Sequence, residues 1–202
     1  MLFYSLLLSL IASCHYQWQP DFEGHLRPTI SVPFVNGDED GMFTAQIIET
    51  ISASGLADVR SHGGQYLLKV SILGEEMEKI GFRVDPQKVD GKVRRNLLAS
   101  EGRRAIKIEA LICQGDDVVR GPYLITADAD YDYVDGDSIQ DLTFVNPEGA
   151  TVTVLPFSLG QLEPNESAAL ASTRPLYRKL AQKILDAISS ESGSDGIFSQ
   201  YR

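Results

Sequence analysis

The pattern of apolar and polar residues predicts a strand followed by an amphipathic helix early in the chain. In residues 29–35, small polar and apolar residues alternate, which is typical of a strand, and Pro33 places it at a sheet edge or near its own end. After a polar turn, apolar residues recur at the three- and four-residue spacing of one helix face, and Gly55 ends this helix. That face consists of Phe43, Ile47, Ile48 and Ile51.

Most of the pattern that follows predicts further strands. Short stretches rich in β-branched and aliphatic residues are separated by turn sequences, and the sequence Gly115-Asp116-Asp117 joins two of them into a hairpin. Between Gly81 and Gly102, glycines, a proline and dispersed charges predict an extended hairpin or a mobile loop. The strand stretches are residues 56–61, 66–73, 103–113, 118–127 and 151–155.

A second amphipathic helix is predicted near the end of the chain, with Thr173 as its cap and Pro175 in its first turn. Its apolar residues recur every four positions. Because two such helices each need an apolar surface to cover, we expect both on one face of a single sheet. The fold class is therefore α+β, a two-layer sandwich with a mostly antiparallel or mixed sheet of about four to six strands. The helix repeat is Leu176, Leu180, Ile184 and Ile188.

Charge is unevenly distributed along the 202 residues, whose formal net charge is −10. A negative protein is repelled by a phosphate backbone, which argues against nucleic-acid binding. Bases gather between residues 79 and 107, and acids between residues 116 and 166. The folded chain should therefore show two oppositely charged zones. The basic group is Lys79, Arg83, Lys88, Lys92, Arg94, Arg95, Arg103, Arg104 and Lys107.

The first residues have the features of an export signal. The apolar run from Leu2 to Ala12 is shorter than the about 20 residues that a membrane-spanning helix needs. The sequence Ile11-Ala12-Ser13-Cys14 resembles a bacterial lipobox, which implies cleavage before Cys14 and attachment of a diacylglycerol and an N-acyl chain such as palmitate to that residue. The alternative is a buried N-terminal strand with an ordinary core cysteine. With Cys14 lipidated, Cys113 has no partner for a disulfide and is expected in the core.

A wider resemblance begins at the same cysteine. Cys14, followed by the aromatic residues Tyr16 and Trp18, the strand 29–36 and a helix, resembles the start of the LptE family of lipopolysaccharide-assembly lipoproteins. The order of a run of strands and a closing helix matches as well. The strand alone is also similar to the opening of TolB-N and CsgG-like envelope proteins, and the lipobox with the aromatic pair favours LptE.

The LptE resemblance implies a non-enzymatic lipoprotein of the Gram-negative outer membrane, facing the periplasm and anchored in the inner leaflet of that membrane. Its partners would be an LptD-like β-barrel, whose assembly it supports, and lipopolysaccharide, which it helps deliver to the outer leaflet. The alternative is a TolB-N or CsgG-like module that self-assembles or joins a secretion complex. The implied divisions are a signal peptide (1–13), a lipidated linker (14–27), the sandwich domain (28–190) and a flexible tail (191–202).

The basic group supplies the candidate contacts with lipopolysaccharide or a partner, because arginine forms short, charge-assisted bonds to phosphate. Neighbouring residues of a regular strand face opposite sides, so Arg94 and Arg95 should not point at one phosphate. A solvated edge strand protected by charge is the alternative. Tyr16 and Trp18 are candidates for the membrane interface, or else pack on the sheet edge. The candidate contacts are Lys92, Arg94, Arg95, Arg103 and Arg104.

No catalytic residue, metal site or cofactor is predicted. The sequence lacks a nucleophile elbow, a P-loop, a dinucleotide fingerprint and zinc-ligand spacing of its three histidines. Asp128, Asp130 and Asp132 invite a calcium interpretation, but the EF-hand pattern would need glycine at Tyr133 and glutamate at Ile139. We instead expect these aspartates to form one polar face of a strand.

Overall fold

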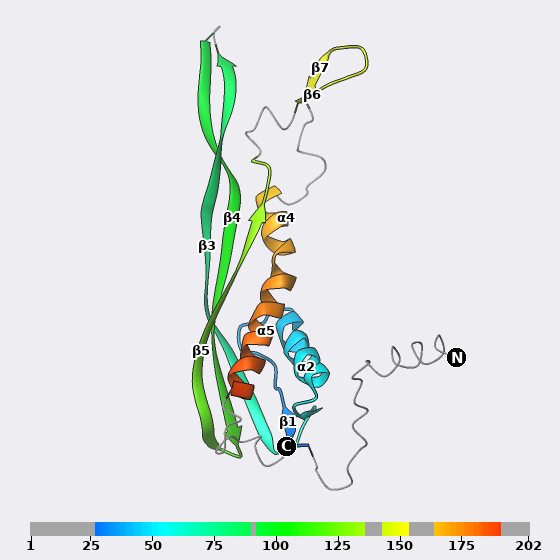
Figure 1. Cartoon of the computed structure of the whole chain (residues 1–202), viewed down its shortest axis with the longest axis vertical. Helices are drawn as coiled ribbons and strands as arrows, with labels where there is room; N and C mark the ends of the chain where they lie inside the picture. The colour runs from blue at the N-terminus through cyan, green and yellow to red at the C-terminus, as the bar shows by residue number, and fades with distance from the viewer. Residues whose placement is uncertain (1–26, 90–91, 136–142, 154–163, 191–202) are drawn as a thin grey trace, which may run out of the picture.

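The chain folds into a mixed sheet with helices on one of its faces (Figure 1). The computed structural model describes residues 27–89, 92–135, 143–153 and 164–190. Its main sheet has five strands in the order β2-β1-β3-β4-β5, and β6 and β7 form a separate hairpin. The elements are β1 (Thr29–Ser31), α2 (Met42–Ser54), β2 (Asp58–Arg60), β3 (Tyr66–Val89), β4 (Lys92–Gln114), β5 (Asp117–Asp132), β6 (Thr143–Val145), β7 (Thr151–Thr153), α4 (Pro164–Ala171) and α5 (Thr173–Ser190).

The sheet combines parallel and antiparallel pairing. Strand β1 is parallel to both of its neighbours, β2 and β3, whereas β4 is antiparallel to both of its neighbours, β3 and β5. A crossover through α2 joins β1 to β2, as parallel pairing requires. Because β1 lies inside the sheet and ends at Ser31, Pro33 follows the strand and removes no ladder hydrogen bond. The predicted two-layer α+β sandwich is confirmed.

The hydrophobic core lies between the helices and the lower half of the sheet. The predicted apolar faces of α2 and α5 are buried except for Ile48 of α2, which is partly buried, and the rings of Phe43 and Tyr177 stack at 4.9 Å between centroids. Opposite them lie Leu68, Ile106 and Ile108, which are fully buried. Burying one such aliphatic side chain contributes about 1.5–3 kcal/mol, so this layer dominates the stability of the fold. No helix in the described part of the chain is long and apolar enough to cross a bilayer.

Polar contacts fix both ends of α2. The carboxylate of Asp38 is 1% exposed and accepts hydrogen bonds from the Phe43 amide (3.3 Å), the Thr44 amide (2.7 Å) and the Thr44 hydroxyl (2.6 Å). These bonds satisfy first-turn amides that have no partner within the helix. Gly55 ends the helix in the left-handed conformation (φ 67°), as predicted. The sequence showed only a polar turn where Asp38 stands.

Strands β3 and β4 form an antiparallel hairpin that rises well past the helices (Figure 1). They contain 24 and 23 residues, against about five or six in an ordinary strand. Strand β5 follows β4 only as far as the pairing of Asp132 with Glu101. Above that point the hairpin has two strands, and we call residues 81–89 and 92–100 the distal ribbon. Of the two alternatives for this stretch, the extended hairpin is correct.

Helix α4 is absent from the sequence prediction. Among those of its residues whose burial is described, only Ala169 is buried, so it lacks the periodic apolar stripe that revealed α2 and α5. Ser172 joins α4 to α5, and the Leu176 amide donates to the Ser172 carbonyl (3.1 Å). The predicted cap residue, Thr173, is the first residue of α5, and its hydroxyl faces the sheet.

Candidate binding surface

One face of the distal ribbon carries a strip of exposed apolar side chains. Partners in an antiparallel ladder share a face, and Val84 pairs with Leu97 while Phe82 pairs with Ala99. Val93, paired with Lys88, continues the same alternation. The apolar strip, defined as Phe82, Val84, Val93 and Leu97, is 51–66% exposed.

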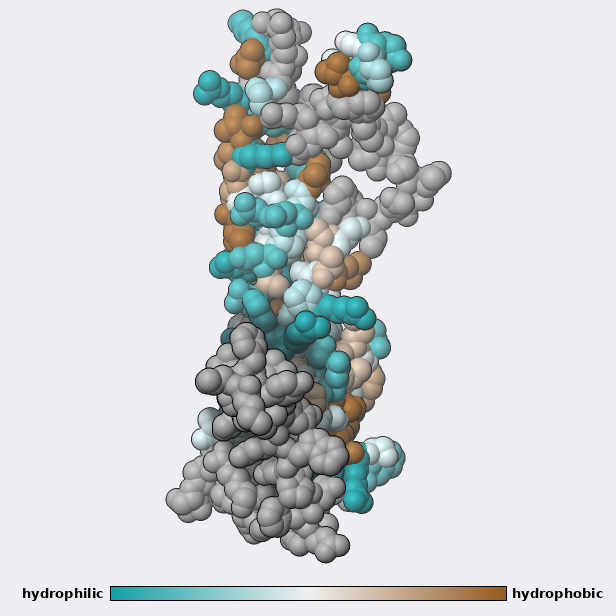
Figure 2. Space-filling model, turned by 45° about the vertical axis from the view of Figure 1, so that its right-hand side comes forward, coloured by the Kyte–Doolittle hydropathy of each residue, from teal (hydrophilic) through white to brown (hydrophobic). Residues whose placement is uncertain are grey.

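This exposure is what distinguishes the ribbon from the rest of β3 and β4. Figure 2 shows hydrophobic residues spaced between hydrophilic ones along the upper part of the molecule, above the helices. Side chains of the same kind lower on these strands, such as Leu68 and Ile106, are fully buried. Contiguous exposed apolar surface marks interaction sites. Sequence reasoning missed the strip, although the alternation of Phe82 and Val84 was visible.

Basic residues lie beside the apolar strip. Lys92 and Arg95 are exposed, and Arg95 pairs with Pro86 on the face that carries Val84 and Leu97. Arg94 pairs with Gln87, and neighbouring positions of a regular strand face opposite sides. That Arg94 and Arg95 do not converge on one phosphate stays a prediction.

Arg103 lies lower, where β5 joins the hairpin, and forms a two-pronged ion pair with Asp130. Its Nε and Nη2 atoms donate to the two Asp130 oxygens at 2.7 and 3.0 Å. The hydrogen bond from Arg103 holds the pKa of Asp130 below its ordinary value, and the same bond raises the pKa of Arg103. Both side chains are about half exposed, at 43% and 51%, so water screens the pair.

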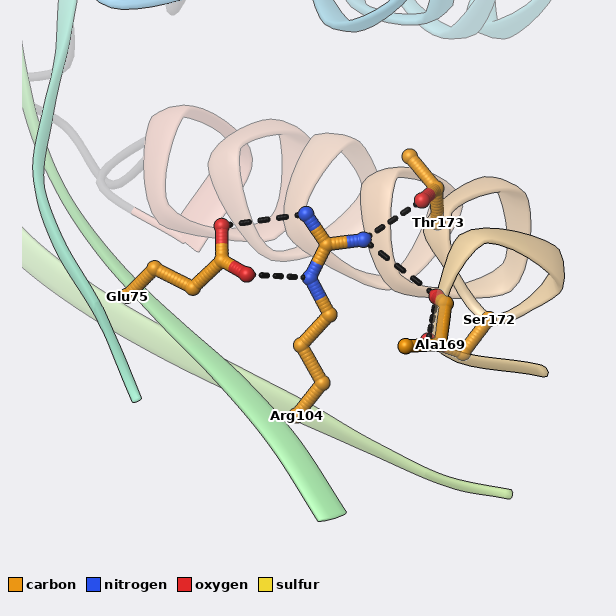
Figure 3. A network of polar contacts seen from close by, with 5 residues as sticks. All are labelled: Glu75, Arg104, Ala169, Ser172 and Thr173. Atoms are coloured by element: carbon orange, nitrogen blue, oxygen red, sulfur yellow. Dashed lines mark hydrogen bonds and ion pairs between the residues drawn. The ribbon is translucent and has the colours of Figure 1, made fainter. Parts of the chain in front are cut away.

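Arg104 points to the other face of the sheet, toward the joint between α4 and α5 (Figure 3). Its Nε and Nη2 atoms donate to Glu75 at 2.6 and 3.0 Å. Its Nη1 atom donates to the hydroxyl of Thr173 at 2.5 Å and to the carbonyl oxygen of Ala169 at 3.4 Å. The side chain of Arg104 is only 11% exposed. Its charge is thus engaged within the chain.

The structure therefore divides the five candidate cations into two groups. Lys92, Arg94 and Arg95 belong to the distal ribbon, where Lys92 and Arg95 are exposed. Arg103 and Arg104 lie below them on opposite faces, each paired with a carboxylate of this chain. Lys92 and Arg95 are therefore better placed than Arg103 and Arg104 to meet an external anion.

The aspartates of β5 form one polar strand face, as predicted. Asp128, Asp130 and Asp132 are exposed, while Ala127 and Ala129, which alternate with them on the opposite face of β5, are buried under the helices. Within the described residues, no group of three or more histidines, cysteines or acids is arranged to hold a metal ion.

The remaining candidates concern cysteines and N-terminal aromatics. Cys113 is a buried free cysteine in β4, which confirms its expected place in the core. Cys14, Tyr16 and Trp18 lie outside the described residues, as do the predicted signal peptide (1–13) and the predicted flexible tail (191–202).

Comparison with known proteins gives structural likenesses at low sequence identity. The chain is similar to a minor lipoprotein from Acinetobacter baumannii, at 14% identity and a TM-score of 0.45, over 82% of this chain and 92% of that one. It is also similar to rare lipoprotein B from Shewanella oneidensis, at 14% identity and a TM-score of 0.40, over 80% of this chain and 94% of that one. A third similar structure is that of an uncharacterized lipoprotein B from Nitrosomonas europaea, at 10% identity and a TM-score of 0.44, over 83% of this chain and 85% of that one. No protein-family model and no curated protein matches the sequence.

Proposed function

We propose that this chain is an LptE-like lipoprotein of the outer membrane, which supports an LptD-like β-barrel and helps deliver lipopolysaccharide without catalysing a reaction. The observation that carries the proposal is the distal ribbon, where an exposed apolar strip lies beside Lys92 and Arg95. The lipobox at Cys14 and the LptE-like start of the sequence support the same assignment.

The ribbon suits an amphiphile that carries both phosphate and acyl chains. Arginine and lysine bind phosphate through charge-assisted hydrogen bonds, whereas Phe82, Val84 and Leu97 offer apolar surface that gains free energy when it leaves water. Lipopolysaccharide combines these two chemistries in lipid A. Because the ribbon stands clear of the helices, a bulky lipid can reach it without disturbing the core (Figure 1).

The body of the molecule suits a protein partner with a polar wall. The sheet face opposite the helices carries exposed charged residues, including Lys107 and Asp128. The lumen of an outer-membrane barrel is polar, and polar complementarity with good shape is what holds such an interface together. A lipidated Cys14 would keep the protein at the membrane, since each buried CH₂ adds about 0.8 kcal/mol to anchoring.

Capture of the native lipoprotein from gently solubilised envelopes tests the proposal. We expect an LptD-like barrel to co-purify with it in a fixed ratio, and radiolabelled lipopolysaccharide to bind the purified protein. If other envelope complexes survive the extraction but no such barrel is captured, the assignment is wrong. A ring-sized mass for the soluble protein would instead favour the TolB-N or CsgG-like alternative.

A further inference from the structure

Two arginines that are adjacent in sequence make ion pairs of almost the same geometry but in different surroundings. Arg103 and Asp130 join two neighbouring strands on an exposed face. Arg104 and Glu75 also lie on adjacent strands, but the guanidinium continues to Thr173 and Ala169, which belong to α5 and α4. The contacts of Arg104 with Glu75, Thr173 and Ala169 thus join both layers of the sandwich at one point (Figure 3).

Helix α4 is short and mostly exposed. It is eight residues long, and its Leu170 is 58% exposed. Isolated helices of this length are unstable in water, so α4 depends on tertiary contacts. The Ala169 carbonyl, which belongs to its last turn, accepts hydrogen bonds from the Ser172 hydroxyl (2.6 Å) and from Arg104. A positive charge at this end also offsets the negative end of the helix dipole.

The contacts of Arg104 lie below the distal ribbon, in the part of the sheet where β5 still pairs with β4. Glu75 follows Gly74 at a register irregularity of β3, where regular pairing with β4 is interrupted. An irregularity of this kind bends and twists a strand. The bidentate bond between Glu75 and Arg104 joins the two strands just above this irregularity.

We propose that Glu75 and Arg104 form a clasp that couples the β3–β4 hairpin below the distal ribbon to α4, so that α4 stays docked only while this part of the hairpin is held in place. Arg104 is then a positioning residue rather than a ligand contact. A molecule that bends the hairpin at this point shifts the docking of α4, and loosening α4 loosens the hairpin around Glu75 to the same degree, because coupling between two sites is reciprocal. This inference does not depend on what the ribbon binds.

Amide hydrogen exchange on the full chain measures the coupling. In Arg104→Gln we expect the amides of α4 to exchange at least about tenfold faster, because charge-assisted hydrogen bonds are lost. The amides of α2 and of β4 around Ile106 should keep their rates, since they belong to the core. Glu75→Gln should act in the same direction, and the double variant should add little to either single change.

Arg103→Gln is the matched control, because it breaks an ion pair of the same geometry on the exposed face. This variant should leave the amide exchange rates of α4 unchanged. The reciprocal test uses Ser167→Gly, an exposed position inside α4 where glycine weakens the helix without removing a buried contact. It should speed exchange in β3 residues 75–79 of the otherwise native chain, and have no effect there when Arg104 is already replaced by glutamine.

Two results would overturn the clasp. One is unchanged α4 exchange in Arg104→Gln. The other is a uniform increase across α2, β4 and α4, because this would mean that Arg104 contributes to global stability without coupling particular elements. A third measurement distinguishes charge from geometry: Arg104→Lys keeps the charge but loses the planar fork, and should give an exchange rate between native and Arg104→Gln.

Discussion

The lower and upper halves of β3 and β4 differ in what covers them. In the lower half, Leu68, Ile106 and Ile108 are sealed beneath α2 and α5. In the upper half, apolar residues alternate in the same way, but Phe82, Val84 and Leu97 are more than half exposed. One hairpin therefore uses the same residue types for two purposes. Where helices cover it, apolar side chains stabilise the fold, and where none does, they remain available for binding.

The largest expected difference between the halves is in stability. Leu180→Ala empties a fully buried position of α5 and should lower the free energy of unfolding by about 2–5 kcal/mol. Leu97→Ala removes the same atoms from a position that is 66% exposed, and should cost less than about 1 kcal/mol. Urea unfolding followed by circular dichroism measures both changes. Similar losses in the two variants would mean that the ribbon is as tightly packed as the body.

The body was largely predictable from sequence because its signals are local. The repeats of Ile47 and Ile51, and of Leu180 and Ile184, revealed both helices that cover the sheet, and Gly55 marked the end of the first. A helix face or a strand can be recognised from residues that are only a few positions apart in sequence. The alternating strand 103–113 was likewise found, although β4 begins earlier, at Lys92.

The ribbon and the Arg104 clasp depend on contacts that no local pattern reveals. Arg104 bonds Ala169 and Thr173, which lie 65 and 69 residues away in sequence. Likewise, whether Val84 is core or surface depends on where the covering helices stop. The candidate site was therefore half predicted: the basic stretch was recognised, but its division between ribbon and base was not.

A second stability prediction concerns the start of α2 and acid. Burial acts to raise the pKa of Asp38, but hydrogen bonds from Thr44 and Phe43 outweigh it and hold the pKa below its ordinary value. A lowered folded-state pKa stabilises the fold above the unfolded value of 3.8, and this contribution is lost as pH falls through the folded pKa. Asp38→Ala should cost about 1–3 kcal/mol at neutral pH.

The loss of stability caused by Asp38→Ala should become smaller below pH 3.8, because the native chain then loses the stabilisation that the Asp38 charge provides at neutral pH. Unfolding curves of both proteins at neutral and acid pH measure the effect. Glu39→Ala is the control, because it removes an exposed carboxylate from the same turn. A stability difference between native and Asp38→Ala that does not change with pH would contradict the role given to the Asp38 charge.

Replacing the two adjacent arginines of the ribbon should have the smallest effect on stability but should weaken binding. Arg94→Glu combined with Arg95→Glu should leave the free energy of unfolding within about 0.5 kcal/mol, because substitutions on an exposed ribbon remove no core contact. Binding of lipopolysaccharide or of the barrel should weaken about tenfold or more, since two charge-assisted contacts become repulsive. Titration with lipopolysaccharide at two salt concentrations measures this, and the loss should be smaller at high salt.

Arg103→Glu with Asp130→Arg provides the control for that measurement, because it reverses an ion pair at the ribbon base while keeping the total charge. It should bind as the native chain does. Unchanged binding by the Arg94 and Arg95 variant would instead assign those arginines to the protection of an edge strand, where charge prevents pairing with other chains. The ribbon would then differ from the body in exposure alone, and its binding role would have to rest on the apolar strip.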